Sequence, residues 1–254
     1  MNYRLTIQYD GTRYSGWQRL GDTPDTIQGK LESVLSRLAG EPVEVHGAGR
    51  TDAGVHALGQ VASVRLPGDT DPALLLDCCA RYLPEDIAVV DVRRAPDRFH
   101  ARLNACGKEY RYALRLGPLP DVFRRKYQYH LAEELDTAAM ERAAAYLTGR
   151  HDFRSFCANR RYKKSTVRTV TAIALDRRGP DLTITFRGDG FLHHMVRILT
   201  GTLIQVGQGR RAPEDMADIL AARDRAAAGP TAPAQGLTLV GVEYPGGPDE
   251  HSET

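Results

Sequence analysis

The sequence has 254 residues, of which 42% are hydrophobic and 26% charged, and its net charge is +2. This length is enough for one large or two smaller globular domains with a buried core. No apolar run is long enough to span a membrane, and the chain starts with a strand pattern instead of an apolar signal region. Four cysteines without Cys-x-x-Cys spacing indicate neither a disulfide framework nor a zinc cluster. We therefore expect a soluble cytoplasmic protein.

The first part of the chain alternates strand and helix patterns. Apolar and polar residues alternate over residues 3–9, which is the period of a half-buried strand. Apolar residues at helical spacing over 27–38 predict a helix, with Thr26 as its N-cap and Gly40 ending it. The further elements expected here are a strand at 61–66, a helix that begins at 71–72 and stops at 84, and a strand at 87–92.

A second domain is expected from residue 106, so that the chain divides into 1–105 and 106–245, followed by a disordered tail at 246–254. Its first strand, 110–116, alternates apolar with basic residues and so presents a basic face. The largely apolar run 191–206 is expected as a buried helix. The other expected elements are helices at 138–147 and 213–222, and strands at 167–175, 182–187 and 237–244. This order of elements predicts an α+β fold with largely antiparallel sheets.

The positive charge is unevenly distributed along the chain. Residues 93–126 hold ten Lys and Arg against three Asp and Glu, and residues 150–168 hold seven against one. Such asymmetry indicates a polyanionic partner that is met on one face. Strands with solvated Arg and Lys on an outer face are the alternative.

The most distinctive segment is the glycine-rich stretch 47–62, which contains Arg50, Asp52 and His56. Loops of this composition hold polar groups in place and let a substrate approach the backbone closely. The segment is not a dinucleotide fingerprint, because Asp52 stands where a glycine is needed and would repel a pyrophosphate. Taken alone, Asp52 could also be a turn aspartate that hydrogen-bonds its own backbone.

Nine collinear segments resemble the TruA-type tRNA pseudouridine synthases. The most specific is Arg-Thr-Asp-Ala-Gly-Val-His at 50–56. The matching segments are 9–18, 26–32, 49–57, 99–102, 108–112, 151–153, 191–198, 234–237 and 242–245. The stretch 154–164 matches least well.

The resemblance implies two similar α+β subdomains that flank a central active-site cleft. It also implies isomerisation of uridine to pseudouridine at positions 38–40 of the tRNA anticodon stem-loop, with base flipping, by a homodimer. The reaction breaks the N1–C1′ bond, turns the uracil and rejoins it through C5, so no redox cofactor or nucleotide is required. We assign no cofactor and no metal, and expect no membrane partner.

The family's catalytic residues correspond to four positions of this chain: Asp52, Arg50, Tyr110 and Arg197. Asp52 is expected to be the essential carboxylate, which could attack the sugar, stabilise positive charge on it or take a proton from it. Arg50 and Arg197 would orient it and keep it ionised. The ring of Tyr110 would pack against the flipped base. His56 is expected to be a structural hydrogen-bonding residue and not a base.

Basic residues from several segments are candidates for binding the phosphate backbone. They are Arg102, Arg111, Arg124, Arg125, Lys126, Arg160, Arg161, Lys163 and Lys164. On a helix, the adjacent His193 and His194 would point about 100° apart and form a poor metal pair.

Three alternatives remain open at this point. The chain could be an RNA-binding or RNA-chaperone protein that has the basic face but no essential chemistry. It could be a hydrolase with an Asp nucleophile, in which Asp10 or Asp189 would supply the second carboxylate. Within the synthase reading, eukaryotic-type relatives that modify other tRNA positions are an alternative for substrate choice, although the compact chain without basic extensions favours the bacterial type.

Overall fold

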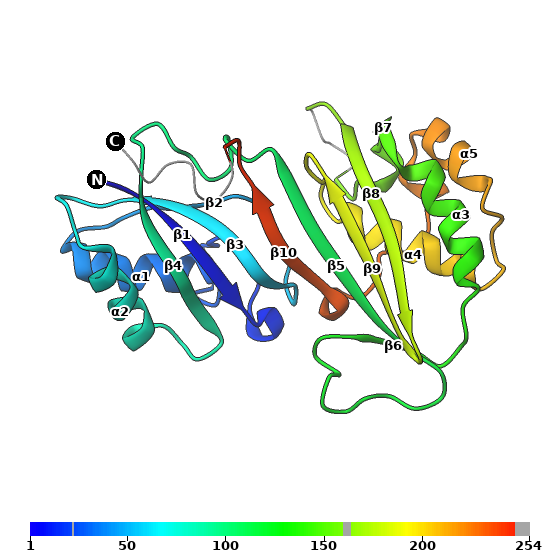
Figure 1. Ribbon diagram of the computed structural model, residues 1–254, viewed down its shortest axis with the longest axis horizontal. Coiled ribbons are helices and arrows are strands. Elements are labelled where there is room, and N and C mark those ends of the chain that lie inside the picture. The colour runs from blue at the N-terminus through cyan, green and yellow to red at the C-terminus, as the bar shows by residue number, and fades with distance from the viewer. Residues whose placement is uncertain (22, 160–163, 247–254) are drawn as a thin grey trace. The chain divides into compact units, whose positions relative to one another are not determined.

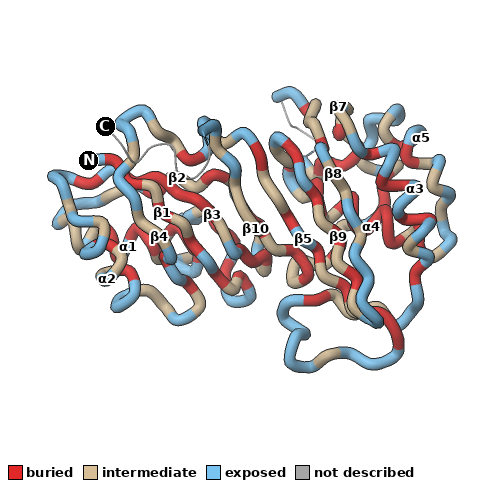
Figure 2. The backbone as a smooth tube through the Cα atoms, viewed as in Figure 1, coloured by how far each residue is buried: buried red, intermediate tan, exposed pale blue. Residues whose placement is uncertain are grey.

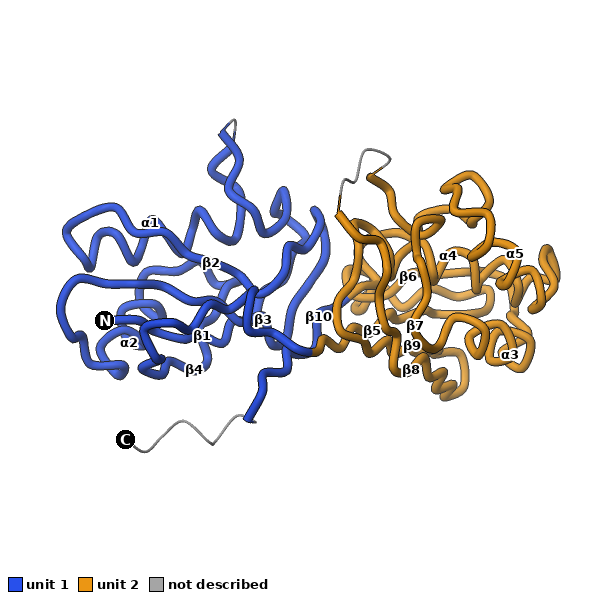
Figure 3. The backbone as a smooth tube through the Cα atoms, turned by 90° about the horizontal axis from the view of Figure 1, so that it is seen from above, with its two compact units in different colours: residues 1–106, 238–254 blue, residues 107–237 orange. Residues whose placement is uncertain are grey.

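The computed structural model describes residues 1–21, 23–159 and 164–246. It divides into two compact units, which are coloured separately in Figure 3. Unit 1 contains residues 1–106 and 238–254, and unit 2 contains residues 107–237. The last strand, β10 (Leu237–Glu243), therefore runs into unit 1, where Thr238 pairs with His56 and Leu239 with Ala57. In addition, the Cys106 N–H donates to the Glu243 carbonyl at 2.9 Å.

Unit 1 is a sheet with two helices, as Figure 1 shows. The strands are β1 (Asn2–Tyr9), β2 (Val45–Gly47), β3 (His56–Arg65) and β4 (Ile87–Ala95), joined by β10 in the order β4-β1-β3-β10 with β2 on β3. Only the β10–β3 pairing of this unit is parallel among the described strands. The alternation expected for residues 3–9 is confirmed, since Tyr3, Leu5 and Ile7 are fully buried, and β1 and β3 carry much of the red in Figure 2.

The helices of unit 1 begin and end where the sequence indicates. In α1 (Ile27–Ala39), the Thr26 hydroxyl accepts the Gly29 N–H at 3.2 Å, and Gly40 ends the helix in the left-handed conformation with φ 74°. In α2 (Pro72–Tyr82), the Asp71 side chain caps the first turn, and the helix packs against β4 and α1. Both starts are encoded locally, by a capping side chain one residue before the helix.

The cap at Thr26 yields a stability prediction. Thr26 is fully buried and its hydroxyl satisfies one of the free amides of the first turn. Thr26→Ala should therefore lower the free energy of unfolding by about 1 kcal/mol, measured by urea denaturation. Thr26→Ser keeps the acceptor oxygen and is expected to lose less. Equal losses in both variants would show that the methyl group, not the cap, carries the effect.

Unit 2 has an antiparallel sheet with helices beside it. Its sheet order is β5-β9-β8-β7, and β6 runs parallel to β5. These strands are β5 (Gly107–Leu116), β6 (Tyr129–Leu131), β7 (Gly149–Asp152), β8 (Val167–Arg178) and β9 (Asp181–Gly188). Its helices are α3 (Thr137–Leu147), α4 (Met195–Gly207) and α5 (Asp215–Ala222), and α3 packs against α4, α5 and β8. The mixed α+β fold and its largely antiparallel strand pairing are confirmed.

The starts of β3 and α4 differ most from expectation. The strand expected at 61–66 begins five residues earlier, at His56, because residues 56–60 pair with β10 and the end of β1. The glycine-rich sequence of this stretch does not show that pairing. The buried helix expected at 191–206 begins only at Met195, because His194 has φ 59° and a left-handed residue cannot continue a helix. Among the helices of the described residues, none is both long and apolar enough to cross a membrane. The tail 247–254 lies outside the described residues.

Candidate active site

Asp52 lies in the segment between β2 and β3 of unit 1. Its side chain is half-buried, Arg50 is exposed and Thr51 between them is buried, with 7% of its surface exposed. The Val55 N–H donates to the Asp52 carbonyl at 3.1 Å, and Gly54 of this turn has φ 78°. A left-handed glycine closes the turn directly after Asp52, so Asp52 lies in a short loop of defined backbone conformation.

The loop is in contact with residues 11–17. The family resemblance covers these residues, but the sequence predicted no structural role for them. The Trp17 N–H donates to the Thr51 carbonyl at 3.0 Å. Gly16 has φ 103°, and a Cβ there would lie 2.7 Å from the same carbonyl oxygen. A Cβ on Gly11 would lie 2.0 Å from the Val55 carbonyl oxygen. Both glycines are therefore needed to let the two backbone segments touch.

His56 supports the structure of this loop, as expected from the sequence. It is 3% exposed, and its Nδ1 accepts the Gly11 N–H at 3.1 Å, while Asp10 Oδ1 lies 3.2 Å from the same nitrogen. An Nδ1 that accepts a backbone N–H presents its lone pair to that bond and not to a substrate. The histidine thus joins β3 to the first turn after β1.

The two carboxylates of the hydrolase alternative both have backbone tasks. Asp10 caps the 3₁₀ turn Gly11–Arg13 by accepting the Thr12 N–H at 2.9 Å. Asp189 accepts the Thr169 N–H at 3.0 Å in unit 2. Both carboxylates thus have a structural task that does not require general-acid chemistry.

Tyr110 and Arg197 both belong to unit 2, on β5 and in the first turn of α4. Tyr110 is 7% exposed and meets Phe191 edge-to-face, with 5.3 Å between the ring centroids. Arg197 is half-buried, and its Nε donates to the Ala232 carbonyl at 2.8 Å while the Ala232 N–H donates to the Arg197 carbonyl at 3.0 Å. Both side chains are thus fixed by local contacts.

The expectation for His193 and His194 was wrong in its geometry. Neither is helical, and their ring centroids lie only 3.9 Å apart with 36° between the planes. Their proximity follows from the left-handed conformation of His194, which the sequence does not reveal. Ala158 donates its N–H to the His193 carbonyl at 3.0 Å, so the histidine pair is tied to the segment that follows β7.

The candidate phosphate-binding residues fall into several groups. Arg102, Arg111, Arg124, Arg125, Lys126 and Lys164 are exposed, whereas Arg160, Arg161 and Lys163 lie outside the described residues. Arg111 pairs with Glu109 at 2.9 Å and Arg124 with Asp181 at 2.9 Å, so these two would have to exchange a carboxylate for a phosphate. The sequence predicted the basic residues 124–126 but not their aromatic neighbour Phe123, which is 89% exposed.

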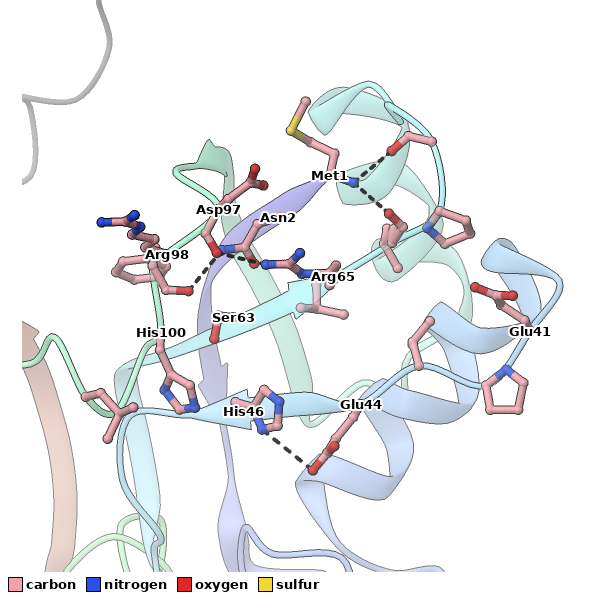
Figure 4. Close-up of a pocket in the computed structure, with 18 residues that line it drawn as sticks. Met1, Asn2, Glu41, Glu44, His46, Ser63, Arg65, Asp97, Arg98 and His100 are labelled. Atoms are coloured by element: carbon pink, nitrogen blue, oxygen red, sulfur yellow. Dashed lines mark hydrogen bonds and ion pairs between the residues drawn. The ribbon is translucent and has the colours of Figure 1, made fainter.

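Unit 1 also has an open groove with a volume of about 790 Å³, shown in Figure 4. It is lined by residues of β2, β3 and the segment 97–103, and contains none of the residues predicted for catalysis. His46 and His100 stack there with ring centroids 5.0 Å apart. Burial and the neighbouring His46 hold the pKa of His100 below its ordinary value. Glutamates and arginines line the groove together, so its charge does not select one kind of ligand.

Known proteins resemble this chain over nearly its whole length. A family model described as tRNA pseudouridine synthase matches residues 5–104 and 143–245. A protein named tRNA pseudouridine synthase A from Bacillus sp. (strain KSM-64) is 46% identical, covering 96% of this chain and 99% of its own. Proteins of the same name from Brevibacillus brevis and Moorella thermoacetica are 45% and 48% identical, each covering 95% of this chain and 98% of their own.

One solved structure, titled "Crystal Structure of a Cbf5-Nop10-Gar1 Complex", has a TM-score of 0.37 at 14% identity. The match covers 80% of this chain and 45% of the chain in the solved structure.

Proposed function

Because the chain belongs to the tRNA pseudouridine synthase family, and is therefore an isomerase, we propose that it converts uridine to pseudouridine at positions 38–40 of the anticodon stem-loop with Asp52 as the essential carboxylate. The observation that carries the proposal is the Asp52 loop itself. Before Asp52, the Thr51 carbonyl accepts a hydrogen bond from the Trp17 N–H. After it, the Val55 N–H donates to the Asp52 carbonyl and forms a turn. A catalytic carboxylate needs such a fixed position, because a small misplacement of a reacting group is costly.

The chemistry asks the protein for few groups. The N1–C1′ bond breaks, the uracil turns and C5 joins C1′. C5 then loses its hydrogen as a proton and N1 takes up a proton, so atoms and charge balance without a redox cofactor or a nucleotide. Asp52 can attack C1′, stabilise positive charge on the sugar or accept a sugar proton, and each route requires the ionised carboxylate. Arg50, two residues before Asp52, favours that ionised form and can also hold a phosphate.

Unit 2 contributes Tyr110 and Arg197 to the proposed reaction. The Tyr110 ring holds the flipped uracil by stacking, and its edge-to-face contact with Phe191 keeps the ring orientation fixed while the base turns. The second arginine, Arg197, orients the carboxylate, and its bond to the Ala232 carbonyl limits the positions that its guanidinium can take. Base flipping costs a few kcal/mol, and less in a loop or at a stem end than inside a duplex.

The substrate is larger than one subunit, and we propose a cytoplasmic homodimer in which one subunit helps to hold the tRNA whose uridine the other modifies. The exposed basic residues bind the phosphate backbone, which makes tRNA affinity fall steeply as salt rises. Sedimentation or light scattering measures the oligomeric state directly, and a monomer at working concentration would contradict this part of the proposal.

The decisive experiment maps pseudouridine in unmodified tRNA after incubation with the wild-type protein in buffer that contains a chelator and no nucleotide. Pseudouridine confined to positions 38–40 is the expected result. Tight, salt-sensitive tRNA binding without any pseudouridine would instead favour an RNA-binding protein. Pseudouridine at other positions would support the isomerase but move its specificity toward the eukaryotic-type relatives.

A further inference from the structure

Two buried polar side chains contact the Asp52 loop and have no task in the proposed mechanism. Tyr9 ends β1 and is 4% exposed, and Gln60 belongs to β3 and is fully buried. The Tyr9 hydroxyl lies 2.8 Å from the Thr51 hydroxyl. Gln60 donates from Nε2 to the Gly49 carbonyl at 2.9 Å. The two contacts thus hold the loop at residues 49 and 51, immediately before Asp52.

Stability alone does not explain this polar arrangement. A buried hydrogen-bonded pair can be exchanged for two apolar groups of the same shape with little change in stability, whereas removing one partner leaves the other unsatisfied. The hydrogen bonds add a defined geometry, because they hold the groups that they join in one arrangement. Burial raises the pKa of Tyr9 well above its ordinary value, so the hydroxyl remains a neutral partner for Thr51 at every working pH.

The contacts fix the peptide group that leads into Asp52. The Thr51 carbonyl and the Asp52 amide nitrogen share one planar peptide. That carbonyl accepts the Trp17 N–H at 3.0 Å, while the Thr51 side chain is held by Tyr9. On the far side, the Asp52 carbonyl accepts the Val55 N–H at 3.1 Å. Both peptide groups that flank the Asp52 Cα are therefore constrained.

We propose that Tyr9, Thr51 and Gln60 are positioning residues, which hold the backbone from Gly49 to Asp52 so that the carboxylate meets the sugar in one orientation. This inference rests on the proposed function, because it assumes that Asp52 carries the reaction. The three residues act on the rate of the chemical step and not on tRNA affinity, since the side chains of all three are buried.

The test compares Tyr9→Phe and Thr51→Val with matched controls in the full-length protein. Each of these two variants removes one hydroxyl contact and retains the approximate shape of the side chain. Thr51→Ser keeps the hydroxyl and serves as the conservative rescue. Tyr3→Phe is the control for a lost buried tyrosine hydroxyl, because Tyr3 lies on the same strand and bonds the Thr70 carbonyl at 2.7 Å, away from the loop. Single-turnover pseudouridine formation, tRNA Kd and thermal unfolding are measured for all four.

The single-turnover rate should fall by about 10- to 100-fold in Tyr9→Phe and Thr51→Val, with an unchanged Kd. It should stay near the wild-type rate in Thr51→Ser and Tyr3→Phe. In the double variant Tyr9→Phe/Thr51→Val, the rate should fall by less than the product of the two single fold-losses, because both substitutions remove the same hydroxyl–hydroxyl contact. Wild-type-like rates in both single variants, or rate losses that follow Kd or equal that of Tyr3→Phe, would overturn the inference. An inactive wild-type protein would instead refute the proposed function.

Discussion

Asp52→Asn is expected to bind tRNA as the wild type does and to form no measurable pseudouridine, a loss of at least about 10⁴-fold in the single-turnover rate. Asparagine has nearly the same shape as aspartate but cannot attack a sugar, balance its positive charge or take its proton. This one substitution therefore blocks all three mechanisms that are open to Asp52. Because Asp52 is half-buried and its neighbours hold the loop through backbone atoms, the fold should tolerate the change.

Asp189→Asn is the matched control for the loss of a carboxylate. Its oxygen accepts the Thr169 N–H, which an asparagine oxygen can also do, so the activity should stay within about twofold of the wild type. A hydrolase-like pair of carboxylates would instead make both variants inactive. If Asp52→Asn retained a tenth of the wild-type rate, the essential carboxylate would have to be sought elsewhere in the chain.

The parts of this fold that could be predicted are those specified by neighbouring residues. The Thr26 cap, the Gly40 stop and the Asp71-Pro72 start each depend on residues within one turn of the helix they delimit, and all three are confirmed. Strand alternation over residues 3–9 was equally readable, because one face of β1 is buried and the pattern follows from that burial.

The errors arose where distant partners or unusual backbone conformations decide the structure. The strand β3 starts at His56 because β10, nearly two hundred residues later in the sequence, pairs with it. Helix α4 starts late because His194 adopts φ 59°, a choice made by its surroundings and not by its residue type. Local patterns contain no record of either cause.

For the candidate site, the sequence pointed to Asp52, and what it could not supply was the support of the loop. Tyr9 and Gln60 were expected only as strand residues, and nothing in their spacing shows that they reach Thr51 and Gly49. One signal for this support is the polar Gln60 beside the apolar Val61 and Ala62, since a buried amide needs a partner. The role of Asp52 is a prediction that Asp52→Asn tests, and the roles of Arg50, Tyr110 and Arg197 also remain predictions.

Gly201→Ala is expected to destabilise the protein by about 3 kcal/mol, at the upper end of the usual cost of overpacking. Replacing a mid-helix glycine by alanine normally stabilises a protein by about 1 kcal/mol, so a loss of stability here has the opposite sign. Gly201 lies within α4, where an added Cβ would stand 1.9 Å from the Pro230 carbonyl oxygen. That oxygen belongs to the backbone of a segment packed on the helix, so relief requires the two elements to separate. Urea denaturation measures the loss.

The same displacement should lower catalysis, because the segment that Gly201 contacts also holds Arg197. Ala232 exchanges two hydrogen bonds with Arg197, and the Gly229 N–H donates to the Thr202 hydroxyl at 2.9 Å. Gly241→Ala is the matched control, since a Cβ at Gly241 meets no atom within 4 Å, and its stability should change by less than about 0.5 kcal/mol. If Gly201→Ala were as stable as the wild type, the helix and the segment at 229–232 could move apart without cost. Arg197 would then lack the fixed position that its proposed role requires.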